Sequence, residues 1–562
     1  MRRAAIKFAF GTAILGGGVT AAAVATSDDP STTLKICTIV PLRLLRDSFT
    51  VASVVADYQY SCWGLKQGST EWLKAKHEAH ERSAYKLQEL CFRNGGIYIK
   101  LGQHISQLEY VIPEEYVRIM KASMLKRCPV SSYDQIRNVV IKELGGPPEK
   151  VFQEFDSKPL ASASLAQVHA ARTHDGQKVA IKVQHTHLTD TAVADIATVN
   201  LIVSFLHWCF PELDYRWLVH EVSESVPKVI LDHKNKLLRS KTETSLLEIL
   251  NFALKELDFL FEARNSLKCM DNFRKLSPHL ARNIYAPKVF WNLSTSRILT
   301  MEFMDAPEIT DVRAIRRLGL EPIDVSKLVS HAFAEMIFKH GFVHCDPHAA
   351  NMMVRPLPSS KWNIFGKKKP QLILLDHGLY RELNFSTRIN YAALWKGLVF
   401  ADVKAIKDNS IKLGAGEDLY VLFAGVLTMR PWQKVVDPSA DHLVIKGNQD
   451  DRAELQMYAA QYFPQISELL RRLPRVILLM LKTNDCLRSV NHTLLQGSSL
   501  ETYFIIGKVA SEALADSKRI TCEGSAFGML SFWLEMILVE VRFLCLKIAM
   551  HLLQLKKAID SH

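Results

Sequence analysis

The sequence predicts an α+β fold in which a strand-rich segment is preceded and followed by helices. From about Cys37 to Lys126, and again from Ile389 to the end, apolar residues recur three and four positions apart, as in amphipathic helices. Between about residues 150 and 305 the period changes to two, which is typical of strands. The 562 residues are 48% hydrophobic and 23% charged, enough apolar material for two lobes of one large globular domain.

Charge and cysteine content argue against two other classes of protein. The net charge of +12 is scattered along the chain, with one local cluster at Lys367, Lys368 and Lys369, so no nucleic-acid partner is expected. The ten cysteines form no CxxC pair and no finger-like spacing with histidine. We expect them to be reduced thiols, most of them in the core.

The first 30 residues differ in composition from the rest of the chain. Arg2, Arg3 and Lys7 precede a stretch rich in Gly, Ala and Val, and no acidic residue occurs before Asp28. This fits a mitochondrial presequence better than a secretory signal, which would have a Leu-rich core. The 19 uncharged residues from Phe8 to Thr26 nearly reach the ~20 needed to span a bilayer. We expect a mitochondrial protein whose first segment either anchors it to the inner membrane or is removed.

Helices and short strands can be placed along the chain in order. Ser131 and Ser132 resemble an N-cap for a helix that runs through Glu143, and the Gly145 to Pro148 segment should end it. Strands are expected at Phe152–Phe155, Gln167–Ala171 and Lys178–Val183, with a hairpin turn at residues 173–176 and a further strand pair within Asn292–Phe303. The apolar stretch Phe527–Leu555 carries four charges, so we expect an amphipathic packing or interfacial helix rather than a membrane span.

The strongest chemical signal is the segment VHCDPHAAN, which runs from Val343 to Asn351. Phosphoryl transfer needs a carboxylate near the attacking hydroxyl, an amide oxygen on the metal ion, and a second carboxylate that bridges metal and phosphates. Asn351 follows Asp346 by five residues, which is the spacing of a kinase catalytic loop, and Asp376 opens an Asp-His-Gly motif further on. We predict that Asp346 is the base, and that Asn351 and Asp376 bind Mg²⁺.

The nucleotide-binding residues are expected upstream of this loop. The run from Val179 to Lys182, VAIK, matches the strand that places a lysine on the α- and β-phosphates. The preceding loop lacks the usual Gly-x-Gly-x-x-Gly and has four small residues instead: Ala161, Ser162, Ala163 and Ser164. Their β-carbons restrict the approach of the backbone to phosphate, so the nucleotide should be held in an unusual way.

Six motifs in order resemble the aarF-domain, or UbiB-like, family of atypical kinases. They are Lys100-Leu101-Gly102-Gln103, the alanine-rich loop, Lys182, Glu256-Leu257-Asp258, His344-Cys345-Asp346-Pro347-His348 and Asp376-His377-Gly378. The run LLMLKTND, from Leu478 to Asp485, is similar to the branch called aarF domain-containing protein kinase 1. The resemblance implies a two-lobed protein-kinase-like fold with an N-terminal helical extension and a helical C-terminal lobe.

The resemblance also assigns roles to further residues. The helix that carries Lys100 and Gln103 should fold over the active site and occlude a protein substrate. Glu256 should pair with Lys100 and Glu262 with Lys182, or the two glutamates could be exchanged. Glu302 and Met304 complete the residues expected to bind ATP or ADP.

The expected domain organisation is a targeting segment (1–30), a helical extension (31–148), an N-lobe (149–305) and a helical C-lobe (306–562). Two features depart from the family pattern. The catalytic loop has Ala349-Ala350 where the family has Pro-Gly, and residues 229–253 form an apparent insertion in the N-lobe. The insertion is a surface loop, a splice-derived segment or a lesion that misplaces Glu262.

Three functions fit these observations. The first is a mitochondrial atypical kinase or ATPase that binds Mg²⁺ and an adenine nucleotide, acts on an unidentified, lipid-like acceptor, and supports mitochondrial lipid or quinone homeostasis and mitochondrial organisation. The second is a catalytically weak, nucleotide-sensing scaffold for mitochondrial membrane proteins. The third is a soluble phosphotransferase that acts on small hydroxyl compounds.

Overall fold

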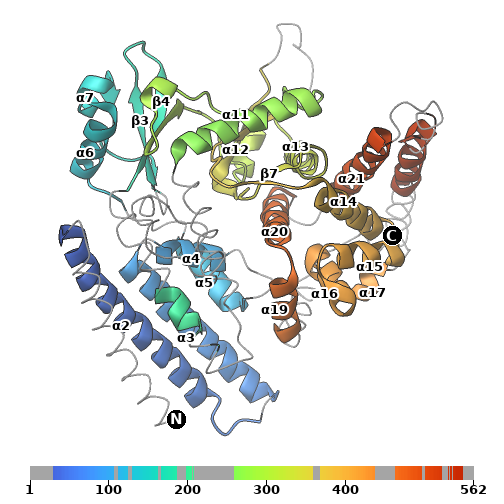
Figure 1. Ribbon diagram of the computed structural model, residues 1–562, viewed down its shortest axis with the longest axis horizontal. Helices are drawn as coiled ribbons and strands as arrows, with labels where there is room; N and C mark the ends of the chain where they lie inside the picture. The colour runs from blue at the N-terminus through green and yellow to red at the C-terminus, as the bar shows by residue number, and fades with distance from the viewer. Residues whose placement is uncertain are drawn as a thin grey trace, which may run out of the picture. The chain divides into compact units, whose positions relative to one another are not determined.

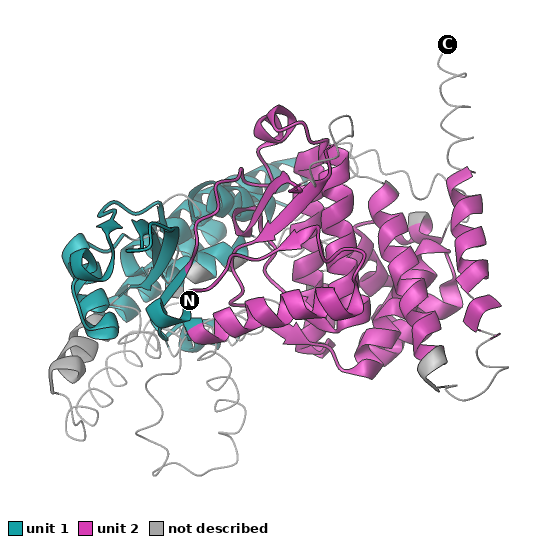
Figure 2. Ribbon diagram, turned by 90° about the horizontal axis from the view of Figure 1, so that it is seen from above, with its two compact units in different colours: residues 1–259, 291–300 teal, residues 260–290, 301–562 magenta. Residues whose placement is uncertain are grey.

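The computed structural model describes most of the chain: residues 30–66, 68–95, 97–106, 112–124, 130–162, 166–185, 198–204, 207, 258–358, 368–436, 463–495, 500–521, 530, 532–534 and 536–548. The chain folds as two compact units (Figure 2). Unit 1 comprises residues 1–259 and 291–300, and unit 2 comprises residues 260–290 and 301–562.

Unit 1 begins with four helices, drawn in blue in Figure 1. They are α2 (Pro30–Ser61), α3 (Thr70–Asn94), α4 (Ile97–Ile105) and α5 (Glu114–Met124). The central helix α3 packs against the other three. Gly95 ends α3 with a φ of +66°, a conformation that favours glycine. Arg82 and Lys86 on α3 bind Asp57 on α2, and together they hold the pKa of that carboxyl well below its usual range.

The next helix of unit 1 is α6 (Tyr133–Leu144), and its ends confirm the sequence prediction. The Ser132 hydroxyl accepts a hydrogen bond from the Gln135 N–H at 3.4 Å, and the Gln135 side chain accepts one from the Ser132 N–H at 3.0 Å. This reciprocal capping box satisfies two amide groups at the start of the helix. Gly145 ends α6 in the left-handed conformation, before the short helix α7 (Pro148–Val151).

A five-stranded sheet follows in unit 1, and only the end of its strand β6, residues 301–302, belongs to unit 2. Its strands are β1 (Glu154–Phe155), β2 (Ala161–Ser162), β3 (Ala166–Arg172), β4 (Lys178–Gln184) and β6 (Ile298–Glu302). The order is β1-β3-β4-β6, and β2 pairs with β3. The antiparallel β3–β4 pair turns through residues 173–176, as predicted, and places Val168 opposite Lys182.

The prediction of a strand pair within Asn292–Phe303 is wrong. This segment contains a 3₁₀ turn, Trp291–Leu293, followed by the single strand β6. The Thr300 hydroxyl donates to the Leu293 carbonyl at 2.6 Å, and the Ser294 hydroxyl accepts from the Thr300 N–H at 3.0 Å. These side chains satisfy backbone groups that a second strand would have paired, so the chain turns instead.

Unit 2 combines two small sheets with many helices. The sheets are β5-β9-β8 and β10-β7, built from β5 (Ile284–Tyr285), β7 (Phe342–His344), β8 (Met352–Pro356), β9 (Pro370–Leu374) and β10 (Tyr380–Glu382). Helices α11 (Phe259–Leu276), α12 (Val312–Arg317) and α13 (Pro322–Ala334) precede most of these strands, and α13 continues as a π-helical segment, Glu335–His340. The helices after the sheets are α14 (Phe385–Val399), α15 (Val403–Lys412), α16 (Gly416–Thr428), α17 (Trp432–Val436), α19 (Phe463–Arg472), α20 (Arg475–Leu495) and α21 (Leu500–Thr521).

The core of unit 2 fixes the strands that carry the catalytic motifs. Val329 and Phe333 of α13 lie in one buried apolar cluster with Val354 of β8 and Leu372 and Leu374 of β9. Helix α13 also packs against α20 and α21. The loops at the ends of β7, β8 and β9 are therefore held by a continuous core.

No helix within the described ranges is long and apolar enough to cross a membrane, and the expected targeting segment lies outside these ranges. The helical residues 536–548 near the C-terminus pack on one side only. Val539 and Phe543 are buried against Phe504 of α21, whereas Ile537 and Leu544 are exposed. This agrees with the amphipathic helix predicted for the segment.

Candidate active site

The loop after β7 holds Asp346 and Asn351 through its own hydrogen bonds. The Asp346 N–H donates to His344 Nδ1 at 3.2 Å, and Asn351 Nδ2 donates to the Asp346 carbonyl at 3.1 Å. Since the amide nitrogen of Asn351 is bonded to the loop, its Oδ1 is the atom that can bind a cation. Asn351 is 8% exposed, so the loop orients this oxygen firmly.

The replacement of Pro-Gly by Ala349-Ala350 does not open this loop. The residues form a 3₁₀ turn, Ala349–Asn351, in which the Asn351 N–H donates to the His348 carbonyl at 2.9 Å. Alanine is compatible with this turn, because neither alanine adopts the positive φ that would favour glycine. The change in sequence therefore leaves Asp346 and Asn351 on one closed loop.

The β8–β9 hairpin ties Asn351 to the segment that carries Asp376. Met352 lies opposite Leu374 in the antiparallel register, and the Leu375 N–H donates to the Asn351 carbonyl at 2.9 Å. Asp376 follows directly, and its Oδ1 accepts a hydrogen bond from the Gly378 N–H at 2.9 Å. The hairpin brings an amide oxygen and a carboxylate, the donors that Mg²⁺ prefers, to one end of the two strands.

Comparisons with known proteins agree with these motifs. A model of the ABC1 atypical kinase-like domain matches residues 123–236 and 229–410. The chain is 62% identical to an Arabidopsis thaliana protein described as an ABC1 protein, over 98% of this chain and 97% of the relative. It is 36% identical to AarF domain-containing protein kinase 1 of Gallus gallus, over 85% and 84% of the two chains. This chain belongs to the ABC1 atypical kinase-like family.

The family membership confirms the predicted fold class, a kinase-like fold of mixed helix and sheet, and the aarF-domain resemblance. A solved structure from Mycobacterium tuberculosis, a complex with erythromycin, aligns with 75% of this chain and 98% of its own at a TM-score of 0.39 and 18% identity. The two stretches that match the ABC1 domain overlap at residues 229–236, which is the start of the apparent insertion. Residues 229–253 themselves lie outside the described ranges.

Helix α11 supports the Asp-His-Gly motif of this ABC1 family member from the side of the protein core. Glu262 is 2% exposed, and its Oε1 accepts a hydrogen bond from the His377 N–H at 3.4 Å. Asn265, one turn later, donates through Nδ2 to the His377 carbonyl at 3.0 Å. Glu262 is thus placed beside the motif that carries Asp376. Its pairing with Lys182 of unit 1 stays a prediction.

The rings of His344 and His377 stack on Tyr380 next to the site. The His377 Nε2–H donates to the Leu374 carbonyl at 3.1 Å, so its Nδ1 accepts from the Tyr380 hydroxyl at 2.9 Å. The rings of His344 and Tyr380 stack with centroids 5.1 Å apart. Burial lowers the pKa of His344 to about 4, although the nearby Asp346 carboxylate opposes this shift. His344 is therefore neutral near pH 7 and can accept the Asp346 N–H.

This shift predicts a loss of stability in acid. The folded state disfavours protonated His344, so its contribution is complete above pH 6.5 and is lost as the pH falls to about 4. The full loss should be roughly 3 kcal/mol in the free energy of unfolding. Urea titrations between pH 7 and pH 4 should show a shallower decline for His344→Phe, which keeps the stacked ring and cannot titrate. An equal decline in both proteins would contradict the prediction.

Lys482 is a site residue that the sequence analysis did not identify. It lies on α20, and its Nζ is 3.3 Å from Asp346 Oδ1. His348 Nε2 is 3.7 Å from the other carboxylate oxygen. Lysine is rarely buried unless it is paired, and Lys482 follows the apolar residues Leu478 to Leu481 within a helical pattern. This break in an apolar run was the signal available in the sequence, but the partner of the lysine could not be read from it.

The predicted nucleotide-binding residues of unit 1 that the structure describes lie on the sheet. Lys182 is on β4, with its Nζ 5.2 Å from the centre of the Phe259 ring. Ala161 and Ser162 form β2, whereas Ala163, Ser164 and Glu256 lie outside the described ranges. Their contacts with a nucleotide remain predictions.

Lys100 and Gln103 both belong to α4. The glycine between them has a packing role. A β-carbon on Gly102 would lie 2.7 Å from Met124 Sδ on α5, so glycine lets the two helices approach closely.

Glu302 and Met304, the remaining predicted nucleotide contacts, belong to unit 2. The Tyr285 hydroxyl donates to the Glu302 carboxylate at 2.5 Å, and the Lys288 N–H does so at 3.3 Å. Burial and this carboxylate raise the pKa of Tyr285 to about 12. Met304 is buried. The Glu302 side chain is thus held by protein groups, and the structure leaves its role with nucleotide untested.

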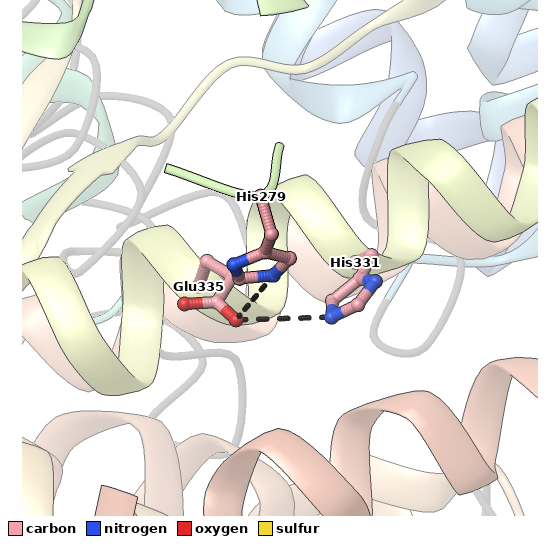
Figure 3. A group of neighbouring side chains, drawn as sticks. All are labelled: His279, His331 and Glu335. Carbon is pink, nitrogen blue, oxygen red and sulfur yellow. Dashed lines mark ion pairs between the residues drawn. The ribbon is translucent and has the colours of Figure 1, made fainter. Parts of the chain in front are cut away.

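A second cluster of potential metal ligands lies away from these motifs in the chain. Within the described residues, His279, His331 and Glu335 are grouped so that both imidazoles face one carboxylate oxygen (Figure 3). Their Nε2 atoms are 3.6 and 3.7 Å from Glu335 Oε1, but Lys339 Nζ is closer, at 3.0 Å. Because an ammonium already neutralises this carboxylate, we assign the cluster a structural role rather than a metal site.

Proposed function

We propose that this chain is an atypical kinase or ATPase that binds ATP or ADP with Mg²⁺. The observation that carries the proposal is the backbone link from Leu375 to Asn351, which joins the catalytic loop to the Asp376 segment. Asn351 Oδ1 and the Asp376 carboxylate supply hard oxygen ligands, so the donor set fits Mg²⁺. When bound, Mg²⁺ neutralises phosphate charge.

Other residues of the chain accept the proton, bind the phosphates and position the Asp-His-Gly motif. Asp346 accepts a proton from the acceptor hydroxyl or orients a water molecule, and neutral His344 fixes the backbone of Asp346. Lys182 binds the α- and β-phosphates from the sheet of unit 1. Glu262 and Asn265 hold the backbone of His377 next to Asp376.

We propose further that the protein acts in mitochondria, on a lipid-like acceptor, in support of lipid or quinone homeostasis. The support for the location is the basic, acid-free composition of residues 1–30. The support for the acceptor class is the resemblance to the aarF-domain family. A fusion of residues 1–30 to a fluorescent reporter tests the location: mitochondrial fluorescence is expected, and cytosolic fluorescence would refute it.

A nucleotide-sensing scaffold is the alternative, and the absence of glycine from the segment ASAS, residues 161–164, favours it. Turnover distinguishes the two functions. We expect Asp346→Asn to lower ATP turnover roughly 100- to 10,000-fold, as the loss of a general base does, and to leave Mg-ADP affinity within a few-fold of wild type. Wild-type protein that binds Mg-ADP but has the turnover of Asp346→Asn would favour the scaffold.

A further inference from the structure

Lys482 is a cation in the buried interior of unit 2. Leu479, Met480 and Leu481, directly before it, are 1–2% exposed, Thr483 after it is fully buried, and Lys482 itself is 6% exposed. Burial of an ammonium group is unfavourable unless an anion and hydrogen-bond acceptors compensate for the lost water. Asp346, the predicted base, provides that anion at 3.3 Å.

Helix α20 holds Lys482 rigidly in this position. On the same helix, Asn491 accepts a hydrogen bond from the Ser326 hydroxyl of α13 at 2.8 Å and donates one to Ser330 at 3.2 Å. Asn484 donates through Nδ2 to the Leu427 carbonyl, at the end of α16, at 2.9 Å. These hydrogen bonds, two of them buried, fix the register of α20 against two neighbouring helices. The packing of α20 against α13 and α16 therefore holds the Lys482 ammonium next to Asp346.

Two histidines also lie near Asp346. His344 is kept neutral by burial, which lowers its pKa to about 4, and the charges that act on its ring are Asp346, Asp376, His348 and Lys482. His348 Nε2 lies 3.7 Å from Asp346 Oδ2, but an imidazole is a cation only when it is protonated. Lys482 Nζ is nearer to the carboxylate, at 3.3 Å from Oδ1.

We infer that Lys482 is a positioning residue for Asp346: its ammonium holds one carboxylate oxygen and so directs the other toward the acceptor. The inference rests on the proposed phosphoryl-transfer function. A general base takes the proton of the attacking hydroxyl or water molecule only if its accepting oxygen lies within hydrogen-bond reach of that proton. A contact of 3.3 Å to Oδ1 therefore sets the direction in which Oδ2 points. The side chain that orients Asp346 thus comes from α20, a helix that lies far after the catalytic loop in the sequence.

Three variants of the full chain test this role. Lys482→Met removes the charge and keeps most of the side-chain length, Lys482→Arg keeps the charge, and Lys482→Met combined with Asp346→Asn removes both partners. The double variant leaves no unpaired charge, so it should fold even if Lys482→Met does not. The matched control is Lys327→Met on α13, where an exposed lysine pairs with Glu501 at 2.7 Å.

Mg-ADP affinity, kcat and KM for ATP are measured for each variant. Lys482→Met should bind Mg-ADP within about threefold of wild type and lose about 10- to 100-fold in kcat with KM nearly unchanged, as expected when a general base is misdirected. Lys482→Arg should restore most of the turnover. In the Asp346→Asn background, Lys482→Met should change kcat less than threefold.

The outcomes separate the inference from the proposed function. If wild type turns over ATP and Lys482→Met has the kcat of Lys327→Met, the positioning role is overturned and the proposed function stands. If Lys482→Met lowers kcat by the same factor in the wild-type and Asp346→Asn backgrounds, or Lys482→Arg restores no turnover, the role is structural only and the inference is again overturned. Wild-type protein with no Mg-ADP binding or no turnover would overturn the proposed function, and the inference with it.

Discussion

Replacement of Asp376 by asparagine should weaken Mg²⁺-dependent binding of ADP by about 100-fold, or about 3 kcal/mol. The substitution keeps the shape of the side chain and the oxygen that accepts the Gly378 N–H at 2.9 Å, so the turn should survive. It removes a full negative charge from a site built for a hard divalent cation. Isothermal titration with ADP in the presence of Mg²⁺ measures the effect.

The control for this prediction is Asp408→Asn, which makes the same change at an exposed position on α15 of the same unit. The control should bind Mg-ADP with wild-type affinity. Titrations in EDTA should reduce the difference between wild type and Asp376→Asn, because Asp376 acts on the metal. If Asp376→Asn bound Mg-ADP as tightly as the control, the assignment of Asp376 as a metal ligand would be wrong.

Replacement of Glu335 by glutamine should lower the free energy of unfolding by about 3 kcal/mol. Glu335 is fully buried, and it accepts hydrogen bonds from the Ser277 hydroxyl at 2.7 Å and from Lys339 Nζ at 3.0 Å. Burial disfavours the charged form of Lys339, but Glu512 and Glu335 together raise its pKa above the ordinary value. Glutamine fits the space and leaves this buried ammonium with one carboxylate partner. Urea denaturation followed by circular dichroism measures the loss.

The matched control is Glu501→Gln, which breaks the ion pair between Glu501 and Lys327. Both side chains of this pair are about 40–50% exposed. An exposed pair contributes at most about 1 kcal/mol, so the control should unfold at nearly the wild-type urea concentration. A loss for Glu335→Gln no larger than that of the control would contradict the structural role. Added Zn²⁺ should not stabilise the wild type, because Lys339 occupies the carboxylate oxygen that both imidazoles face.

Local signals in the sequence predicted the parts of the site that depend on short spacing. The catalytic loop brings Asp346 and Asn351 together within five residues, and this spacing identified both as site residues. The capping box at Ser132 and the glycine at Gly145 likewise depend on residues only a few positions apart. Such features can be predicted because the partners are chosen by local chain geometry.

Long-range contacts could not be predicted in the same way. Lys482 lies 136 positions after Asp346, and its contact depends on how α20 packs against α13 and α16. Glu335 has a partner, Ser277, in the turn after α11, and its other partner, Lys339, also binds Glu512 on α21. The sequence shows only an acidic residue within a helical pattern. The strand pair expected within Asn292–Phe303 was wrong because Ser294 and Thr300 bond to the backbone, a choice that competes with strand pairing.

The thermal stability of the full chain with ADP, measured in Mg²⁺ and in EDTA, shows whether the protein has a nucleotide site. A ligand that binds the folded state at 100 times its Kd adds about 2.7 kcal/mol to the free energy of unfolding. We predict a clear rise in melting temperature with Mg-ADP, a smaller rise in EDTA, and no rise for Lys182→Ala. No rise for the wild type in either condition would contradict a nucleotide site built from Lys182, Asn351 and Asp376.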